Sequence, residues 1–199
     1  MKEDNSTSNL LKWFENDDLF FRECREGQRW QEYVGRYLNT KGVKVHVEEL
    51  SFRGNPNVSR YSDDEASRWS LARKKMKIAR KEYVNTKDIL VLPSAVLEVK
   101  SRNLRFTSPK DFPFDTVFID TVSGYEQKKP KPRLYISVSR KTGCIIATSG
   151  VNSGKWSKRK IYDKVRNIWE INYECAIENW LHIDDYIPAM KRYQEVLAK

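Results

Sequence analysis

The feature that most constrains the fold is the apolar run at residues 88–100, which reads DILVLPSAVLEVK. From residue 95 onward every odd position is apolar, so one side of a strand would be wholly apolar, while Glu98 and Lys100 share the other side. Pro93 interrupts the run and favours a turn between two strands. The run therefore predicts an antiparallel strand pair with one apolar face and one charged face.

The turn at Pro93 decides where Asp88 lies. In an antiparallel pair the numbers of any two facing residues add up to the same sum. A two-residue turn at Pro93 would make this sum 187. Asp88 would then face Val99 and lie on the apolar face. A three-residue turn or a bulge gives 186 or 188 and sets Asp88 opposite Glu98 or Lys100. Proline cannot donate a ladder hydrogen bond and favours such an irregular turn. We therefore expect Asp88, Glu98 and Lys100 on one face.

Two carboxylates and an amine in one place can act on phosphodiesters. Clustered carboxylates suit Mg2+, or alternatively Mn2+, because both are hard ions that prefer oxygen ligands. Lys100 could orient or deprotonate an attacking water and offset charge on the phosphate. A plainer interpretation of Glu98 and Lys100 is a cross-strand charge pair on a solvated face. The pattern favours a metal-dependent nuclease over that interpretation.

Asp88, nine intervening residues and the triplet Glu98-Val99-Lys100 resemble the motif of the PD-(D/E)XK nuclease superfamily. The resemblance implies that Asp88 and Glu98 hold the metal, that Lys100 serves the water and that Val99 lends a backbone carbonyl. A proline commonly precedes the aspartate in that family, and here the position is Lys87. The fold implied is α/β, a restriction-endonuclease-like core with a mixed central sheet flanked by helices.

A second acid-x-Lys triplet lies further along the chain. Asp115 is followed after ten residues by EQK at 126–128. Two prolines follow this triplet closely and favour a loop, whereas Glu98 lies in a strand-like run. The sequence therefore favours Asp88, Glu98 and Lys100 as the site.

Residues 27–42 read as a helix that ends at Gly42, followed by a strand over 43–50. Superfamily members often open with such a helix, whose glutamate helps to order the metal site. In this chain Gln31 occupies the position after the large apolar residue, and Glu32 comes one later. At about 100° per residue Gln31 lies at the edge of the apolar face and Glu32 points nearly opposite. We expect Gln31 to serve the site and Glu32 to be a solvated surface acid.

The balance of 37 basic and 27 acidic residues gives a net charge of +10. It favours a polyanionic partner, although DNA, RNA and an anionic membrane surface share that property. The insertion at 51–87 is expected to hold a basic helix, which would contact phosphate, form a solvated charged face or lie on a membrane surface. The expected nucleic-acid contacts in this helix and in two later loops are Arg73, Lys74, Lys77, Arg102, Arg105, Gln127, Lys128 and Lys129.

Several classes of protein are disfavoured by missing patterns. No run of 18 apolar residues predicts a membrane span, and the polar start MKEDNSTSN does not resemble a signal peptide. The three cysteines lack CxxC spacing, which argues against a zinc knuckle or a disulfide framework and fits a reducing cytoplasm. No P-loop glycine pattern supports nucleotide hydrolysis.

The length of 199 residues suits a single nuclease domain, 1–199. Strands are expected at 116–120, 133–138 and 144–148, with a hairpin turn between the last two. The stretch 112–148 is similar to phage-encoded and restriction-type members of the superfamily. Residues 156–199 are expected to be helical from the spacing of their apolar residues.

These features predict a Mg2+-dependent DNA endonuclease. One alternative is a structure-specific nuclease of the junction-resolvase type, in which a homodimer would grip the arms. The other is an inactive nucleic-acid-binding protein with a nuclease-like fold, because Gln31 stands where the family has an acid.

Overall fold

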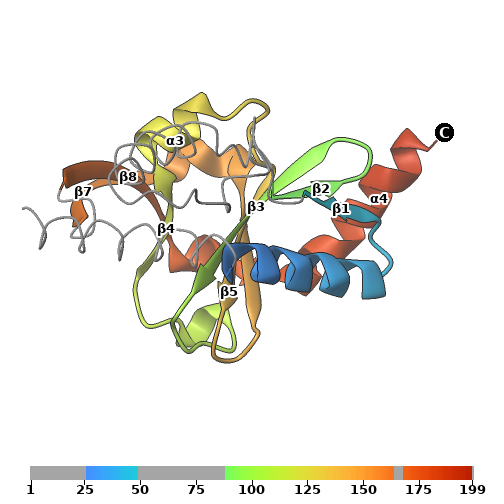
Figure 1. Ribbon diagram of the computed structural model, residues 1–199, viewed down its shortest axis with the longest axis horizontal. Coiled ribbons are helices and arrows are strands. Elements are labelled where there is room, and N and C mark those ends of the chain that lie inside the picture. The colour runs from blue at the N-terminus through green and yellow to red at the C-terminus, as the bar shows by residue number, and fades with distance from the viewer. Residues whose placement is uncertain (1–25, 49–87, 164–167, 199) are drawn as a thin grey trace, which may run out of the picture. The chain divides into compact units, whose positions relative to one another are not determined.

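A computed structural model of the protein describes residues 26–48, 88–163 and 168–198 (Figure 1). The chain divides into two compact units, Met1–Val47 with Lys87–Lys199, and Glu48–Thr86. All described residues except Glu48 belong to the first unit. The expected basic helix with Arg73, Lys74 and Lys77 lies outside the described residues, so its prediction is not tested.

The larger sheet is mixed and has the strand order β1-β2-β3-β5-β6-β9. β3 and β5 run parallel, and the other neighbours are antiparallel. The expected hairpin near residues 140–143 is confirmed, since β5 and β6 pair antiparallel across it. The strands are β1 (Val45–Val47), β2 (Ile89–Val91), β3 (Ala95–Arg102), β5 (Leu134–Ser139), β6 (Ile145–Ser149) and β9 (Leu181–His182).

The register of β2 and β3 is one of the two that were expected to place Asp88 on the same face as Glu98. Ile89 faces Leu97 and Val91 faces Ala95, so facing residue numbers sum to 186 and three residues form the turn. Extending this register by one residue sets Asp88 opposite Glu98. The prediction that an irregular turn brings these two residues to one face is confirmed.

The apolar face of the larger sheet is covered by two helices, the helix of residues 26–40 and α4 (Ile187–Leu197). The first helix stops where it was expected to, because Gly42 adopts a φ of 81° that side chains with a Cβ rarely adopt. Within the described residues, none of the helices combines the length and the apolar character needed to span a bilayer. The core here is made by Val34, Leu38, Val43, Ile89, Val91, Leu97, Val99, Leu134, Ile136, Val138, Ile145, Ala147, Ile183, Ile187 and Met190.

A second sheet, with strand order β4-β8-β7, packs on the other face of the larger sheet. Its strands β4 (Thr116–Thr121), β8 (Ile168–Ala176) and β7 (Ser157–Asp163) are antiparallel. The short helix α3 (Val122–Gln127) follows β4, and short 3-10 segments span Pro109–Asp111, Gly150–Lys155, Ile177–Asn179 and Ile183–Tyr186. The core between the sheets is made by Phe106, Val117, Ile119, Tyr135, Ile146, Trp156, Cys175 and Trp180.

The prediction of a helical segment over 156–199 is wrong for most of its length. β7 and β8 form a hairpin there, and only the last part is α-helical, as α4. The apolar residues fit both periods: Ile161, Val165 and Ile168 follow one another at spacings of four and three, while Trp169, Ile171 and Tyr173 alternate. Aromatic and β-branched residues favour the strand when it packs against a sheet, and that packing decided the outcome.

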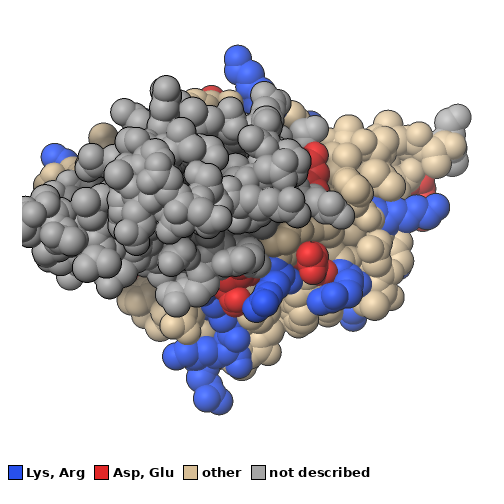
Figure 2. All heavy atoms as spheres, viewed as in Figure 1, with Lys and Arg blue, Asp and Glu red and all other residues tan. Residues whose placement is uncertain are grey.

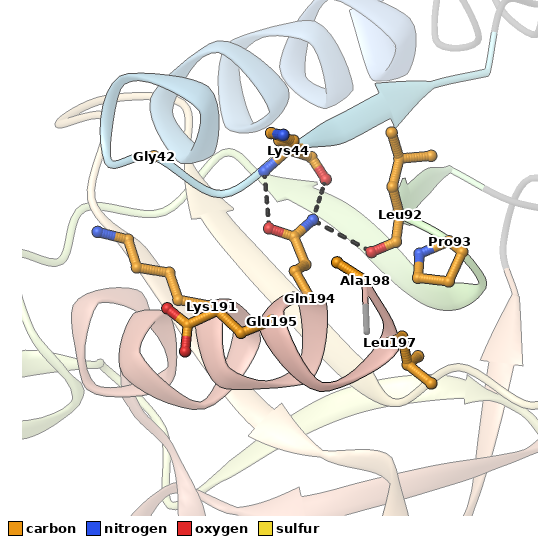
Figure 3. Close-up of a pocket in the computed structure, with 9 residues that line it drawn as sticks. All are labelled: Gly42, Lys44, Leu92, Pro93, Lys191, Gln194, Glu195, Leu197 and Ala198. Atoms are coloured by element: carbon orange, nitrogen blue, oxygen red, sulfur yellow. Dashed lines mark hydrogen bonds between the residues drawn. The ribbon is translucent and has the colours of Figure 1, made fainter.

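The side chain of Gln194 fastens α4 to the turn end of the β2–β3 hairpin (Figure 3). Its amide accepts from the Lys44 N–H at 3.1 Å and donates to the carbonyls of Lys44, at 2.6 Å, and Leu92, at 3.2 Å. The pocket around it has a volume of about 490 Å³. Because backbone groups already satisfy the amide and Asp88 lies at the opposite end of β2, this pocket is not the candidate active site.

Candidate active site

Asp88 stands directly before β2 and is only 7% exposed. Its Oδ2 accepts a hydrogen bond of 2.6 Å from the backbone N–H of Val99. Burial, followed by repulsion from Glu98, raises the pKa of Asp88 to about 7, although the Val99 N–H, Lys100 and Lys128 oppose the shift. Near neutral pH the chain therefore holds a carboxyl group that has lost much of its tendency to ionise.

Glu98 and Lys100 lie on the face of β3 that the alternation predicted. Glu98 is 8% exposed, and the Lys100 ammonium lies 3.0 Å from Glu98 Oε1. In the parallel register Glu98 is beside Tyr135 of β5 and Lys100 is beside Ser137. The two residues do form a charge pair, but Glu98 is buried, so the interpretation of this face as solvated is wrong.

Two further charged residues complete the group: the sequence did not indicate Asp120 as a site residue, and it indicated Lys128 only as a nucleic-acid contact. Asp120 ends the buried part of β4, and Lys128 follows α3. The Lys128 ammonium lies 2.6 Å from Glu98 Oε1 and 2.5 Å from Asp120 Oδ2, and the Lys100 ammonium lies 3.7 Å from Asp120 Oδ1. We call Asp88, Glu98, Lys100, Asp120 and Lys128 the acid-lysine cluster.

A break in the strand pairing turns Asp120 toward the cluster. Plain alternation would place Asp120 with Phe118, on the side of β4 opposite to Ile119. The β4–β8 register shifts between Phe118 and Asp120, and both Ile119 and Asp120 are buried. A Cβ at Gly124 would lie 2.7 Å from Thr121 Oγ1 and 3.1 Å from Asp120 Oδ1, so a larger residue there would require these side chains to shift.

The lysines control the ionisation of Glu98. Burial alone would raise the pKa of Glu98, but the charges of Lys100 and Lys128 outweigh it and hold the pKa below its usual value. Burial likewise disfavours the Lys128 ammonium, and the charges of Glu98 and Asp120 outweigh it and raise the pKa of Lys128. Glu98 is thus ionised at neutral pH beside an Asp88 that is easily protonated, so the two acids differ in state.

Tyr135 places a buried hydroxyl next to the same charges. Its Oη is buried and has no hydrogen-bond partner among the described residues. Burial, followed by the charges of Glu98 and Asp120, raises the pKa of Tyr135 and keeps the phenol protonated. The ring is fixed by edge contacts with Trp156, at 5.3 Å between ring centres. The phenol is therefore a rigid donor without a partner beside the acid-lysine cluster.

Gln31 and Glu32 differ in burial as the helical geometry predicted. Gln31 is buried and Glu32 is exposed. Gln31 Oε1 has no hydrogen-bond partner in the part of the chain that the structure describes. A role for Gln31 at the metal site stays a prediction.

The remaining predicted contacts are distributed over several places. The Arg102 guanidinium is half-buried and donates to the Phe118 carbonyl at 2.5 Å, and burial lowers the pKa of Arg102 to about 10. Arg105, Gln127 and Lys129 are exposed. Lys128, also expected to contact DNA, belongs to the acid-lysine cluster.

The second triplet does not form a site of its own. Asp115 lies just before β4 and Glu126 lies in α3, and both are exposed. Only its third member, Lys128, is held by buried carboxylates. The preference for Glu98 and Lys100 over this triplet agrees with the geometry.

The carboxylates of the acid-lysine cluster supply oxygen atoms, which are the ligands that Mg2+ and Mn2+ prefer. Among the described residues no group of three or more His, Cys, Asp or Glu side chains is placed to hold a metal ion. Asp88 and Glu98 supply two carboxylates, and Mg2+ commonly keeps several waters and takes only one or two carboxylates from the protein. Two carboxylates are within the number that Mg2+ takes from a protein, and two ammonium groups contact Glu98 Oε1.

On the face shown in Figure 2, described acidic side chains lie directly beside basic ones. The same alternation of sign marks the acid-lysine cluster, where three carboxylates accompany two ammonium groups. No known protein family matches the chain, and neither a curated protein nor a solved structure does. The geometry of the site therefore has to support any functional assignment.

Proposed function

We propose that the protein is a metal-dependent DNA endonuclease that hydrolyses phosphodiester bonds at Asp88, Glu98 and Lys100. The observation that supports this best is the register sum of 186, which brings Asp88 opposite Glu98 in a buried, charged site. Burial of several charged groups together costs stability and is common at functional sites. The net charge of +10 agrees with DNA as the partner.

Asp88 and Glu98 would hold Mg2+ or Mn2+, with the Val99 carbonyl as a third ligand. The ion would supply charge for the phosphate and would lower the pKa of water. Repulsion between Asp88 and Glu98 favours a cation between them. The cation would offset this repulsion and so lower the pKa of Asp88, which burial and Glu98 now raise.

Lys100 would orient the attacking water and offset negative charge on the phosphate. Its ammonium contacts Glu98 at 3.0 Å and lies 3.7 Å from Asp120, so two carboxylates restrict its position. Asp120 and Lys128 act as positioning residues, because Asp120 can keep the Lys128 ammonium when Glu98 turns to another cation. Gln31 would contribute its buried amide oxygen.

A second candidate is an inactive nucleic-acid-binding protein. It is favoured by Lys128, whose ammonium lies 2.6 Å from Glu98 Oε1 and partly neutralises the cluster without a metal. Gln31 in place of the family acid agrees with it. This candidate predicts DNA binding that Mg2+ does not change and no cleavage.

Cleavage of supercoiled plasmid with Mg2+ and with EDTA tests the proposal. We expect cleavage with Mg2+ only, and its loss in Asp88→Asn and Glu98→Gln, while DNA binding is retained. Asp115→Asn and Glu126→Gln are matched controls, because they remove the same charges from exposed positions. Full activity of Asp88→Asn or Glu98→Gln, or intact DNA after incubation with Mg2+, would contradict the proposal.

The form of the product separates two kinds of nuclease. Discrete linear bands from plasmid indicate a restriction-type enzyme. Preferential cutting of four-way junctions indicates a structure-specific enzyme of the resolvase type, which we expect to act as a homodimer.

A further inference from the structure

The β7–β8 hairpin exposes several large apolar side chains. Trp169 is 62% exposed and Ile171 is 52% exposed, and Tyr162 is exposed as well. Tyr162 faces Trp169 and Lys160 faces Ile171 across the two strands, so these four side chains share one face. Clustered exposed apolar side chains of this kind usually mark an interaction surface.

Lysine side chains accompany the aromatic rings on this face. The Lys160 ammonium lies 5.3 Å from the centre of the Trp169 ring, and the Lys158 ammonium lies 5.3 Å from that of Tyr173. The Tyr162 and Trp169 rings have centres 5.3 Å apart. We call Lys158, Lys160, Tyr162, Trp169 and Ile171 the aromatic-basic ribbon.

The ribbon continues into the acid-lysine cluster. Tyr173 of β8 pairs with Lys158 on one side and with Asp120 on the other. Trp169 lies four residues along the same strand, which corresponds to about 13 Å at about 3.3 Å per residue. A ligand strand on the ribbon would therefore lead toward the candidate active site.

The charges of β7 indicate what kind of partner fits. In the described parts of β7 and β8, the charged residues on the ribbon face are lysines. β7 is an edge strand with three successive exposed cations, Lys158, Arg159 and Lys160, and like charges oppose pairing with the same edge of a second copy. A polyanion suits this surface better than another copy of the chain.

We propose that the aromatic-basic ribbon binds an unpaired DNA strand, with bases stacked on Trp169 and phosphates held by Lys158 and Lys160. Aromatic rings stack on unpaired bases of any sequence, whereas a duplex keeps its base faces covered. The choice of DNA rests on the proposed function, and the ribbon would guide an unpaired strand to the acid-lysine cluster.

Fluorescence anisotropy with a labelled thymidine oligonucleotide of about 12 nucleotides, within the reach of such surfaces, tests the proposal in EDTA. We expect the full chain to bind it more tightly than the duplex of the same length. Trp169→Ala should weaken binding about 5- to 150-fold, as for the loss of one stacked base, and Trp169→Phe should restore much of it. The plot of log K against log salt has a negative slope, and Lys160→Ala should make that slope less steep by about 0.7, because one phosphate contact is lost.

Phe114→Ala is the matched control, since Phe114 is 57% exposed but lies outside the ribbon, and it should bind like the wild type. Thermal unfolding of each variant verifies the fold. Equal affinity in Trp169→Ala, tighter binding of the duplex, tighter binding to anionic lipid vesicles, or a dimer that Trp169→Ala dissociates would each overturn the proposal. Because the anisotropy experiment measures binding and not cleavage, it can contradict the proposed role of the ribbon while plasmid cleavage still supports the endonuclease. Plasmid cleavage can likewise be absent while the ribbon binds an unpaired strand.

Discussion

Leu97 and Val99 of β3 pack among apolar side chains beneath the helix of residues 26–40 and α4. Glu98 and Lys100, one residue away along the same strand, lie on the opposite face with Asp120 and Lys128. The first face lowers the free energy of the fold by removing apolar surface from water. The second face gathers charges that burial disfavours, and ion pairs and the Val99 N–H that donates to Asp88 compensate for part of that cost.

The contrast between the two faces of β3 indicates that the charged face lowers the stability of the folded chain. Asp88 has its pKa raised to about 7, which means that its ionised form is unfavourable in the folded chain. Groups of this kind are typical of sites that evolved for binding or catalysis, since stability and activity often conflict there.

The largest effect is expected from Glu98→Gln on the charged face. It should reduce the rate of DNA cleavage by at least about 10² to 10³-fold, as for removal of one electrostatic group from an active site. The variant should remain folded, because the amide keeps the shape of the side chain. Plasmid cleavage and circular dichroism measure the two properties, and a variant that is unfolded at room temperature would show that Glu98 is chiefly structural.

Leu97→Ala tests the apolar face at the neighbouring position. Leu97 is fully buried, and its truncation should lower the free energy of unfolding by about 2 to 5 kcal/mol through lost burial and a cavity. Denaturant titration measures this change. Cleavage per folded molecule should change little, and a loss as large as that of Glu98→Gln would mean that the two faces are not separable.

Asp88→Asn should stabilise the protein in a pH-dependent way. Between the usual pKa of 3.8 and about 7, the folded chain binds the Asp88 proton more tightly than the unfolded chain does, so wild-type stability falls as pH rises through this window. Asparagine does not ionise, so the variant does not lose this stability as pH rises, and its amide oxygen can still accept a hydrogen bond from the Val99 N–H. The gain should be near zero below pH 4 and reach on the order of 2 to 4 kcal/mol above pH 7.

Denaturant titrations of wild type and Asp88→Asn at several pH values give the difference directly. Asp115→Asn is the control, and its stability difference should not vary in this window in the same way. A constant difference from acid to alkaline pH would show that Asp88 is not strained by burial and by Glu98.

Lys128→Met should have the smallest of the four effects and still exceed its control. It removes a cation that contacts both Glu98 and Asp120, at a cost of about 1 to 3 kcal/mol for leaving buried partners unsatisfied. Lys129→Met changes an exposed neighbour and should stay within about 0.5 kcal/mol of wild type. Equal melting temperatures for the two variants would show that the Lys128 contacts do not hold the cluster together.

Local patterns predicted the larger sheet well. The alternation around Glu98 and the turn at Pro93 were sufficient to determine which face Asp88 occupies, because a strand allows only two faces. Gly42 marked the end of the first helix for an equally local reason, its positive φ. Such features depend on a few neighbouring residues.

The second sheet depends on contacts between residues far apart in the sequence, and so do the positions of Asp120 and Lys128 in the acid-lysine cluster. Alternation alone would turn Asp120 away from the cluster, and only the register shift in β4 brings it in. Lys128 follows a short helix near two prolines, where it looked like a surface loop lysine. The hairpin of β7 and β8 is not apparent in the sequence, because Ile161, Val165 and Ile168 follow the helical spacing and packing on a sheet is not visible in the spacing.

The central claim, that Asp88 and Glu98 form a site for a divalent cation, is tested most directly by calorimetric titration of Mg2+ into the full chain. At about pH 6.5, in two buffers of different ionisation enthalpy, we predict binding with release of part of a proton, because Asp88 is largely protonated below about pH 7 until the cation binds. Asp88→Asn should lose both the binding and the proton release, and Asp115→Asn should keep both. Absence of Mg2+ binding in the wild type, or unchanged binding in Asp88→Asn, would contradict the account.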